Sequence, residues 1–344
     1  MEDQAVENIL KSIGDPAQEH ALGRQGVALA ERSGEGWIRA RGPDAVAYVH
    51  KLTSNDVEAL ADGEGQHSLY LTGNGKVLSE LYVYRVSGDE LYLEVPAAGA
   101  ATVAQRFEMF ILNKDLIIED ASSERVVFSL QGPGARAALE SLGAAPPSAP
   151  FAHALCDLDG VSCRLIARDR FGLGGVDVIA PRAEAEAVAD LLRKAAEEHG
   201  GGVVGAAAWE SLRVEAGVPL FGADIDGQVI PQEAFLERSA VSFDKGCYPG
   251  QETVAKVKYR GQVNRLLVRL ELQAEAPPEH NAELRHDGRV VGRLTSAAAV
   301  PGHDGLLGLG YVKRALAKAG GEVTVCSEGR GDCTARVVPI PELA

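Results

Sequence analysis

The sequence predicts an α+β fold of antiparallel sheets and helices, followed by a small antiparallel β-barrel. Strand-to-helix units recur in the first half, strong helices follow, and beyond about residue 264 the pattern changes to short strands alone. A chain of 344 residues exceeds what one hydrophobic core usually supports. We therefore predict one region over residues 1–263 and a separate barrel domain over residues 264–344.

Two segments 90 residues apart share one pattern. "IRARGPDAVAYVHKL" (38–52) and "FSLQGPGARAALESL" (128–142) each place a short extended run before a Gly-Pro or Gly-Pro-Gly step and a helical pattern. Proline suits the first turn of a helix because its missing N–H would have no partner there. The pattern predicts two similar strand-to-helix units, and the alternative is a chance likeness between two good helix starts.

Alternating residues predict strands between and after these units. The stretch 67–95 alternates apolar and polar residues around turn signals, which indicates an antiparallel meander. The stretch 154–169 predicts a hairpin that turns at Asp159-Gly160 and sets Cys156 opposite Cys163. A disulfide would fit that spacing, but a reducing cytosol favours two thiols.

Two helices and a group of strands complete the prediction. Residues 182–199 form a strongly amphipathic pattern, and residues 205–217 indicate a helix that ends at Gly217. From residue 264 on, short strands are separated by turn signals such as His286-Asp287-Gly288. Closure into an antiparallel barrel or sandwich satisfies such strands.

Composition excludes several classes of protein. A net charge of −15 argues against direct nucleic-acid binding over the whole surface, because such binding needs cations that displace counterions from phosphates. No run approaches the roughly 20 apolar residues of a membrane helix, and the acidic amino terminus is unlike a signal peptide. Five cysteines without a C-x-x-C pair indicate neither a disulfide framework nor a metal site. We expect a cytoplasmic protein without a tightly bound metal.

One segment is basic in this acidic chain. Five cations stand against one acid, Glu252, between residues 245 and 265: Lys245, Lys256, Lys258, Arg260 and Arg265. The segment is either a solvated run of charge or a local site for an anionic ligand. A third interpretation, an RNA-binding accessory protein, is disfavoured by the acidic total charge.

The stretch "DKGCYPGQET" (244–253) poses the main question about chemistry. Pro249 and Gly250 are typical of a type II turn. If a helix follows, its amino end together with Lys245 would lower the pKa of the Cys247 thiol. No histidine motif accompanies the cysteine as in a cysteine hydrolase. Residue chemistry alone leaves Cys247 open between a reactive thiol and an inert structural residue.

With these residues together, the chain resembles the YgfZ family of folate-binding proteins, within the glycine-cleavage T-protein (aminomethyltransferase) superfamily. "KGCYPGQE" matches the family signature K-G-C-Y-x-G-Q-E position for position, and the resemblance extends over nearly the whole length. "LRVEAGVPLFGADID" (212–226) is similar to the superfamily's R-x-E-A-G-x-P segment, and "GPDAVAYVHKLTSNDV" (42–57) supports it. The motif residues beside the cysteine are Gly246, Tyr248, Gly250, Gln251 and Glu252.

The resemblance implies three lobes around a central hole that receives tetrahydrofolate, a carboxyl-terminal β-barrel and a monomeric state. It assigns the carboxylate that binds the pterin's amino-pyrimidine to Glu215. A carboxylate is a good acceptor for two such N–H groups, which would explain an acid at an unfavourable helix end. The other expected folate contacts are Tyr84, Asn55 and Arg260, and the basic segment would receive the glutamate tail or an acidic partner.

One departure bears on function. The superfamily's aminomethyltransferases carry an Asp-Asp pair where this chain has Ser79 and Glu80. The resemblance to the YgfZ branch therefore implies a tetrahydrofolate-binding accessory protein for iron–sulfur cluster assembly or repair, supporting enzymes such as those of tRNA methylthiolation. Cys247, with Lys245 nearby, would be its functional thiol, and cluster proteins or assembly factors its partners. The alternative is a folate-dependent aminomethyltransferase or another one-carbon transferase.

Overall fold

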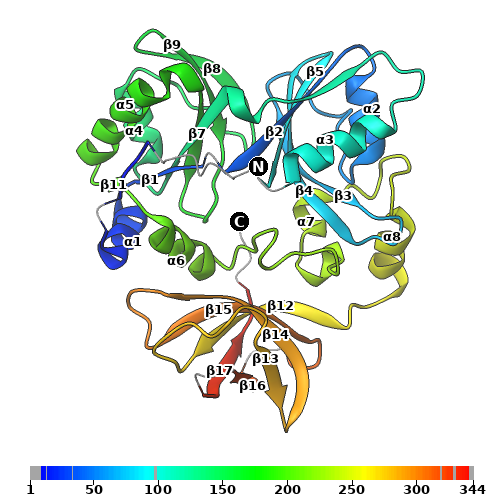
Figure 1. Ribbon diagram of the computed structural model, residues 1–344, viewed down its shortest axis with the longest axis vertical. Helices are drawn as coiled ribbons and strands as arrows, with labels where there is room; N and C mark the ends of the chain where they lie inside the picture. The colour runs from blue at the N-terminus through cyan, green and yellow to red at the C-terminus, as the bar shows by residue number, and fades with distance from the viewer. Residues whose placement is uncertain are drawn as a thin grey trace, which may run out of the picture.

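The computed structural model describes residues 9–340 except 13, 33, 97–98, 318–319 and 328–330, and it has three lobes (Figure 1). Two sheet-and-helix lobes stand side by side, and the barrel lies below both. The predicted α+β class with antiparallel sheets and a closed carboxyl-terminal barrel is confirmed. Within the described part of the chain, no helix is long and apolar enough to cross a membrane.

The first lobe is a five-stranded antiparallel sheet in the order β3-β4-β5-β2-β6. Its strands are β2 (Glu35–Arg41), β3 (Gly65–Leu71), β4 (Val77–Ser87), β5 (Glu90–Pro96) and β6 (Ile117–Asp120). Helices α2 (Ala45–Leu52) and α3 (Ala100–Met109) pack on one face, where alternate strand residues such as Leu81, Val83 and Leu93 are buried. The predicted meander over 67–95 is confirmed as β3, β4 and β5.

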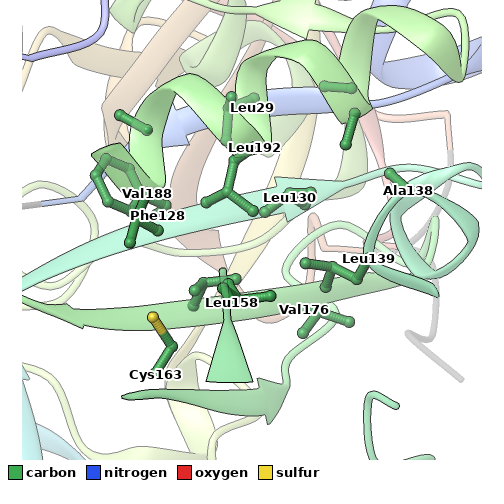
Figure 2. Packing of buried hydrophobic residues seen from close by; sticks show 14 of the residues in the cluster. Leu29, Phe128, Leu130, Ala138, Leu139, Leu158, Cys163, Val176, Val188 and Leu192 are labelled. Atoms are coloured by element: carbon green, nitrogen blue, oxygen red, sulfur yellow. The ribbon is translucent and has the colours of Figure 1, made fainter. Parts of the chain in front are cut away.

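The second lobe is a six-stranded sheet in the order β11-β1-β7-β10-β9-β8. Its strands are β1 (Ala28–Glu31), β7 (Arg125–Gln131), β8 (His153–Leu158), β9 (Val161–Ala167), β10 (Gly175–Pro181) and β11 (Gly202–Val203). Helices α4 (Ala135–Ser141) and α5 (Ala185–Glu198) cover one face, and Figure 2 shows Val188 and Leu192 of α5 above Phe128 and Leu130 of β7.

The two predicted strand-to-helix units occupy corresponding places in these lobes. β2 leads through Gly42 into α2, and β7 leads through Gly132 into α4. Both glycines have positive φ, 127° and 122°, and a Cβ at either position would come within 2.5 Å of a backbone oxygen. The shared Gly-Pro step therefore reflects one backbone geometry used twice. The predicted hairpin is also confirmed, with Cys156 opposite Cys163 and both thiols free.

The remaining elements join the lobes to the barrel. Helix α1 (Pro16–Gln25) packs on α6 (Ala206–Ala216), which ends at Gly217 with φ 75°, as predicted. A long connection carries α7 (Glu237–Ala240) and α8 (Gln251–Arg260). The barrel closes in the order β12-β15-β14-β13-β16-β17. Its strands are β12 (Arg265–Leu272), β13 (Glu283–His286), β14 (Arg289–Ala299), β15 (Leu306–Lys313), β16 (Glu322–Cys326) and β17 (Cys333–Val338).

Candidate functional site

A cavity of ≈ 890 Å³ opens where the three lobes meet. Its wall takes Glu80 and Tyr82 from β4, Arg168 and Arg170 from the loop after β9, and residues 266–268 from β12. Aromatic side chains make up much of the remaining surface: Phe151, Phe171, Trp209, Phe221 and Phe235. Aromatic walls combined with polar groups held in fixed positions are typical of a site for a small organic molecule.

Glu80 is a fixed carboxylate on this wall. Strand alternation turns it away from the helix-covered face, so it lies with Tyr82 on the cavity side. Its Oε1 accepts a hydrogen bond from the Tyr82 hydroxyl at 2.7 Å and lies 3.0 Å from Nε2 of His67. Burial alone would raise the pKa of Glu80, but the hydrogen bond and charge of His67 and the Tyr82 hydroxyl hold that pKa below its usual value.

Two arginines extend the polar wall next to Tyr82. The Arg168 guanidinium lies 3.3 Å from the centre of the Tyr82 ring and donates to Glu94 at 2.8 Å and to the Tyr84 hydroxyl at 2.9 Å. Arg170 donates to both oxygens of Glu35 at 3.1 and 3.0 Å. Sequence reasoning missed these residues, although the charged "ARDR" after a predicted strand was the available signal.

Ser79 and Glu80 are not equivalent in the structure. Ser79 is buried, and its hydroxyl donates to the carbonyl of Glu80. Glu80 supplies a carboxylate directly to the cavity. The replacement of an Asp-Asp pair therefore leaves an acid on the wall, one methylene longer than the family's aspartate. The departure is therefore not a reason to prefer the accessory role over the transferase alternative.

Glu215 does not belong to the cavity wall as the structure describes it. Its carboxylate faces α1, where Oε2 lies 2.9 Å from His20 Nε2 and 3.9 Å from Arg24 Nε. The hydrogen bond from His20 lowers the pKa of Glu215 despite partial burial. These two partners explain why an acid is stable at the carboxyl end of α6, where the helix dipole opposes it. Its role toward a pterin stays a prediction.

The other three predicted folate contacts also lie off the wall. The Tyr84 hydroxyl is buried between the sheets, where it donates to Glu94 at 2.9 Å and accepts from Arg168. Asn55 donates to the carbonyls of His67 and Ser239, so it holds the segment behind the cavity. Arg260 is exposed at the end of α8. Tyr84 and Asn55 thus support the structure around the cavity, and Arg260 lies neither on the cavity wall nor next to these two residues.

The cysteine motif packs against the first lobe, at the end of α2 and at the turn between β3 and β4. Residues 248–251 adopt the predicted type II turn, with Gly250 at φ 81° and ψ −2° and Gln251 N–H bonded to the Tyr248 carbonyl. A Cβ on Gly250 would come within 2.5 Å of the Thr72 carbonyl oxygen. Tyr248 is buried, Gln251 begins α8, and Glu252 and Gly246 are exposed. Cys247 is exposed and free.

Lys245 has a different task from the one predicted. Its ammonium donates to the carbonyls of His50, Thr53 and Asn55, at the carboxyl end of α2, rather than to the thiol. Burial lowers the pKa of Lys245 to about 8. Activation of Cys247 by Lys245 stays a prediction that these contacts do not support.

We expect Lys245→Met to lower the free energy of unfolding by about 1–3 kcal/mol, because it leaves buried carbonyls without a donor. Urea denaturation measures the change. Lys256→Met, on the exposed face of α8, is the control and is expected to stay within about 0.5 kcal/mol of the parent protein. Equal stability of the two variants would contradict the proposal that Lys245 stabilises the carboxyl end of α2 through these hydrogen bonds.

Comparison with known proteins identifies the fold. The GCVT N-terminal domain model matches residues 13–245, and the glycine cleavage T-protein C-terminal barrel domain model matches residues 265–342. The chain belongs to the glycine-cleavage T-protein family. The division at residues 263 and 264 lies between the matched ranges and stays a prediction.

Relatives of this T-protein family cover the chain almost completely. An aminomethyltransferase of Flavobacterium psychrophilum is 28% identical over 99% of both chains, and one of Symbiobacterium thermophilum is 30% identical over 94% of this chain and 88% of its own. The glycine cleavage system aminomethyltransferase T from Bartonella henselae has a similar crystal structure, with TM-score 0.85 and 26% identity over 96% of this chain and 90% of its own.

Proposed function

We propose that this T-protein-family chain binds tetrahydrofolate in its central cavity and catalyses a folate-dependent one-carbon transfer of the aminomethyl type. The observation that carries the proposal is the buried, ionised Glu80 on an aromatic cavity wall. The names of the relatives support the same activity. Both favour the transferase alternative over the iron–sulfur accessory role as the principal function.

The residues present fit a folate. A cavity of ≈ 890 Å³ is large enough for a drug-sized ligand. Phe171 and Trp209 offer aromatic surfaces for a pterin or aminobenzoyl ring, and the Glu80 carboxylate offers oxygen acceptors for its N–H groups. Among the described residues no cluster of ligands for a metal ion is present.

Bound folate would supply the nitrogen atoms that carry the one-carbon unit. Glu80 would hold or accept a proton near such a nitrogen, because its lowered pKa keeps it ionised at neutral pH. His67 and Tyr82 fix the carboxylate's position, and Ser239 in turn bonds Nδ1 of His67.

The direct test is a titration with tetrahydrofolate followed by tryptophan fluorescence and calorimetry. The chain has two tryptophans, of which Trp209 lines the cavity and Trp37 is buried between the sheets. Binding in the cavity is expected to quench the emission of Trp37→Phe, where only Trp209 emits. Trp209→Phe is the matched control and should lose most of the quenching. Absence of calorimetric binding to the parent protein would contradict the proposal.

The basic face of α8 provides a second prediction. Lys258 lies 3.4 Å from the Phe243 ring centre and near Glu237, which is adjacent to the cavity residue Arg238. We therefore expect a folate with several glutamates to bind more tightly than the monoglutamate, and salt to reduce that gain. Arg260→Glu should weaken only the polyglutamate, by roughly two- to five-fold. Arg289→Glu on the barrel is the control, and equal effects of both variants would exclude a role for α8.

A second candidate function rests on Cys247. Lys245, Tyr248 and Gly250 of its motif have clear structural roles, whereas the Cys247 side chain is exposed. The fold therefore does not require a cysteine at position 247. This supports the YgfZ-type interpretation, in which the chain is a folate-binding accessory protein that serves iron–sulfur cluster proteins or assembly factors. Its monomeric state and cytoplasmic location stay predictions.

We expect Cys247→Ala to leave the unfolding free energy within about 0.5 kcal/mol of the parent value, because the side chain is exposed. If the accessory role holds, the variant fails to restore cluster-enzyme activity in a strain that lacks the protein, although it still binds tetrahydrofolate. Cys156→Ala, remote in sequence and on β8, is the control. Full restoration by Cys247→Ala would exclude the thiol function and leave the transferase proposal intact.

A further inference from the structure

Besides Glu80, the cavity wall holds a second group of acids, the neighbouring pair Glu35 and Glu94. Trp37 of β2 pairs with Glu94 of β5, so Glu35, two residues earlier on β2, is the diagonal neighbour of Glu94 on the same sheet face. Both residues line the cavity, and both are nearly inaccessible: the side chain of Glu94 is 4% exposed and that of Glu35 is 12% exposed. Their carboxyl groups both accept from the Nη2 group of Arg170, at 3.0 Å for Glu35 and 3.4 Å for Glu94.

A count of hydrogen bonds shows that one oxygen of Glu94 has only a shared, distant donor. The Nη2 group of Arg170 has two protons but faces three carboxyl groups: Asp177 at 2.6 Å, Glu35 at 3.0 Å and Glu94 at 3.4 Å. Glu35 is also served by Nη1 of Arg170 and by Arg32. The Oε1 atom of Glu94 therefore has the weakest supply of donors.

The closeness of the two carboxyl groups leads to the same atom. Two buried acids that share one arginine Nη2 group do not both stay ionised at neutral pH, because like charges repel strongly in a low dielectric. Burial and the neighbouring Glu35 raise the pKa of Glu94 to about 8, whereas Arg170 and Arg32 hold that of Glu35 well below its usual range.

We propose that Glu94 is the proton donor of the cavity and that Glu35 is the positioning residue that shares its proton. The inference rests on the proposed function, because the acceptor is a nitrogen of the cavity ligand. The O–H bond of Glu94 breaks, an N–H bond forms, and the carboxylate left behind is held by Arg168 and Arg170. After the ligand leaves, the pair takes one proton from water.

The assignment gives the two wall acids opposite states at neutral pH. Glu80 is ionised through His67 and Tyr82, and Glu94 is neutral through burial and its carboxylate neighbour. Two acids in one cavity whose pKa values are pushed apart are the usual arrangement for an acid and a base. The charged or titratable groups that face Glu94 from the surrounding elements are Glu35, Tyr82, Tyr84, Arg168 and Arg170, with Asp177 beyond Arg170.

Infrared spectroscopy of the full chain tests this without any turnover. At pH 7 the ligand-free protein should show the C=O band of a protonated carboxyl group, which disappears as the pH rises through about 8. Glu94→Gln should lack the band. Glu90→Gln, on the same strand but paired with Arg39, is the control and should keep it. Saturation with tetrahydrofolate at pH 7 should remove the band from the parent protein.

The outcomes separate the two proposals. No protonated carboxyl band in the ligand-free protein, or a band that persists in Glu94→Gln, overturns the inference while folate binding still stands. A band that tetrahydrofolate leaves unchanged, although calorimetry shows it bound, assigns the proton to a purely structural pair and also overturns the inference. Failure of tetrahydrofolate to bind overturns the proposed function and with it the ligand step.

Discussion

Asp224→Ala is expected to lower the free energy of unfolding by about 3–5 kcal/mol, because it removes a buried carboxylate on which four donors depend. Asp224 is fully buried. Its carboxylate accepts from Arg213 Nη1 at 2.7 Å, from Leu220 N–H at 2.9 Å and from the hydroxyls of Ser296 and Thr295. Removal of the carboxylate would leave the Arg213 guanidinium, which is 5% exposed, with Glu210 as its remaining ion-pair partner and without its link to the Asp224 segment.

This network also connects the barrel to the cavity. Arg213 lines the cavity from α6, while Ser296 and Thr295 belong to β14. We therefore expect Asp224→Ala to weaken tetrahydrofolate binding as well as stability, since Leu267 of the barrel completes the wall. The Tyr311 hydroxyl, which donates to the Asp224 carbonyl, should remain bonded.

Urea denaturation followed by circular dichroism measures the change. Asp226→Ala is the matched control: that side chain is 37% exposed, and its pair with Arg293 should contribute less than about 1 kcal/mol. The double variant Arg213→Met, Asp224→Ala should recover part of the loss, because the buried Arg213 charge is removed together with the carboxylate that it faced. A loss in Asp224→Ala no larger than in Asp226→Ala would show that the network does not hold the barrel.

Local patterns made the fold predictable. Alternation over 67–95 specified the meander, the repeated Gly-Pro step specified two strand-to-helix units, and Gly217 ended its helix as expected. These features depend on neighbours within a few residues, for which side-chain spacing and backbone conformation are decisive. The closed barrel followed because short strands without helices have few other ways to protect their edges.

The site was harder to predict because its residues meet from distant segments. Glu35, Glu94 and Arg170 lie on β2, on β5 and after β9, and no spacing in the sequence relates them. The partner of Glu215 is His20, which is 195 residues away in the sequence. No feature of the sequence indicates this pair, and the resemblance therefore assigns the carboxylate of Glu215 to a ligand. Lys245 is a similar case, since its acceptors lie in the last turn of α2 and on the loop after it, about 190 residues earlier in the chain.

The cysteine motif shows how a resemblance and the structure contribute differently. The sequence match located the motif, and its turn geometry is as predicted. The structure adds that the motif fastens the connection before the barrel to the loop after α2 and to the turn between β3 and β4. The turn geometry explains Gly250, and the hydrogen bonds to the end of α2 explain Lys245. No such contact explains the exposed Cys247, so a chemical role of its thiol is the hypothesis to test.

Glu80→Gln is expected to reduce kcat of the one-carbon transfer by roughly 10²- to 10⁴-fold, the usual contribution of a positioned acid or base. The amide keeps the size of the side chain and can still bond Tyr82 and His67, so fold and cavity should persist. It carries no charge and takes up no proton. We expect the affinity for tetrahydrofolate to change by less than about ten-fold, so the loss should appear in kcat rather than in KM.

The pH dependence distinguishes this role from a structural one. The pKa of Glu80 is lower in the folded protein than in the unfolded chain. Its ionised form therefore stabilises the fold fully when the pH is above the unfolded-state pKa, and this stabilisation is lost as the pH falls through the folded-state pKa. Activity of the parent protein should therefore persist at mildly acidic pH. Glu80→Asp keeps an acid and should recover part of kcat, and Glu90→Gln is the surface control. If Glu80→Gln retained the parent kcat, the carboxylate would serve His67 and Tyr82 alone, and the transfer chemistry would have to be placed elsewhere.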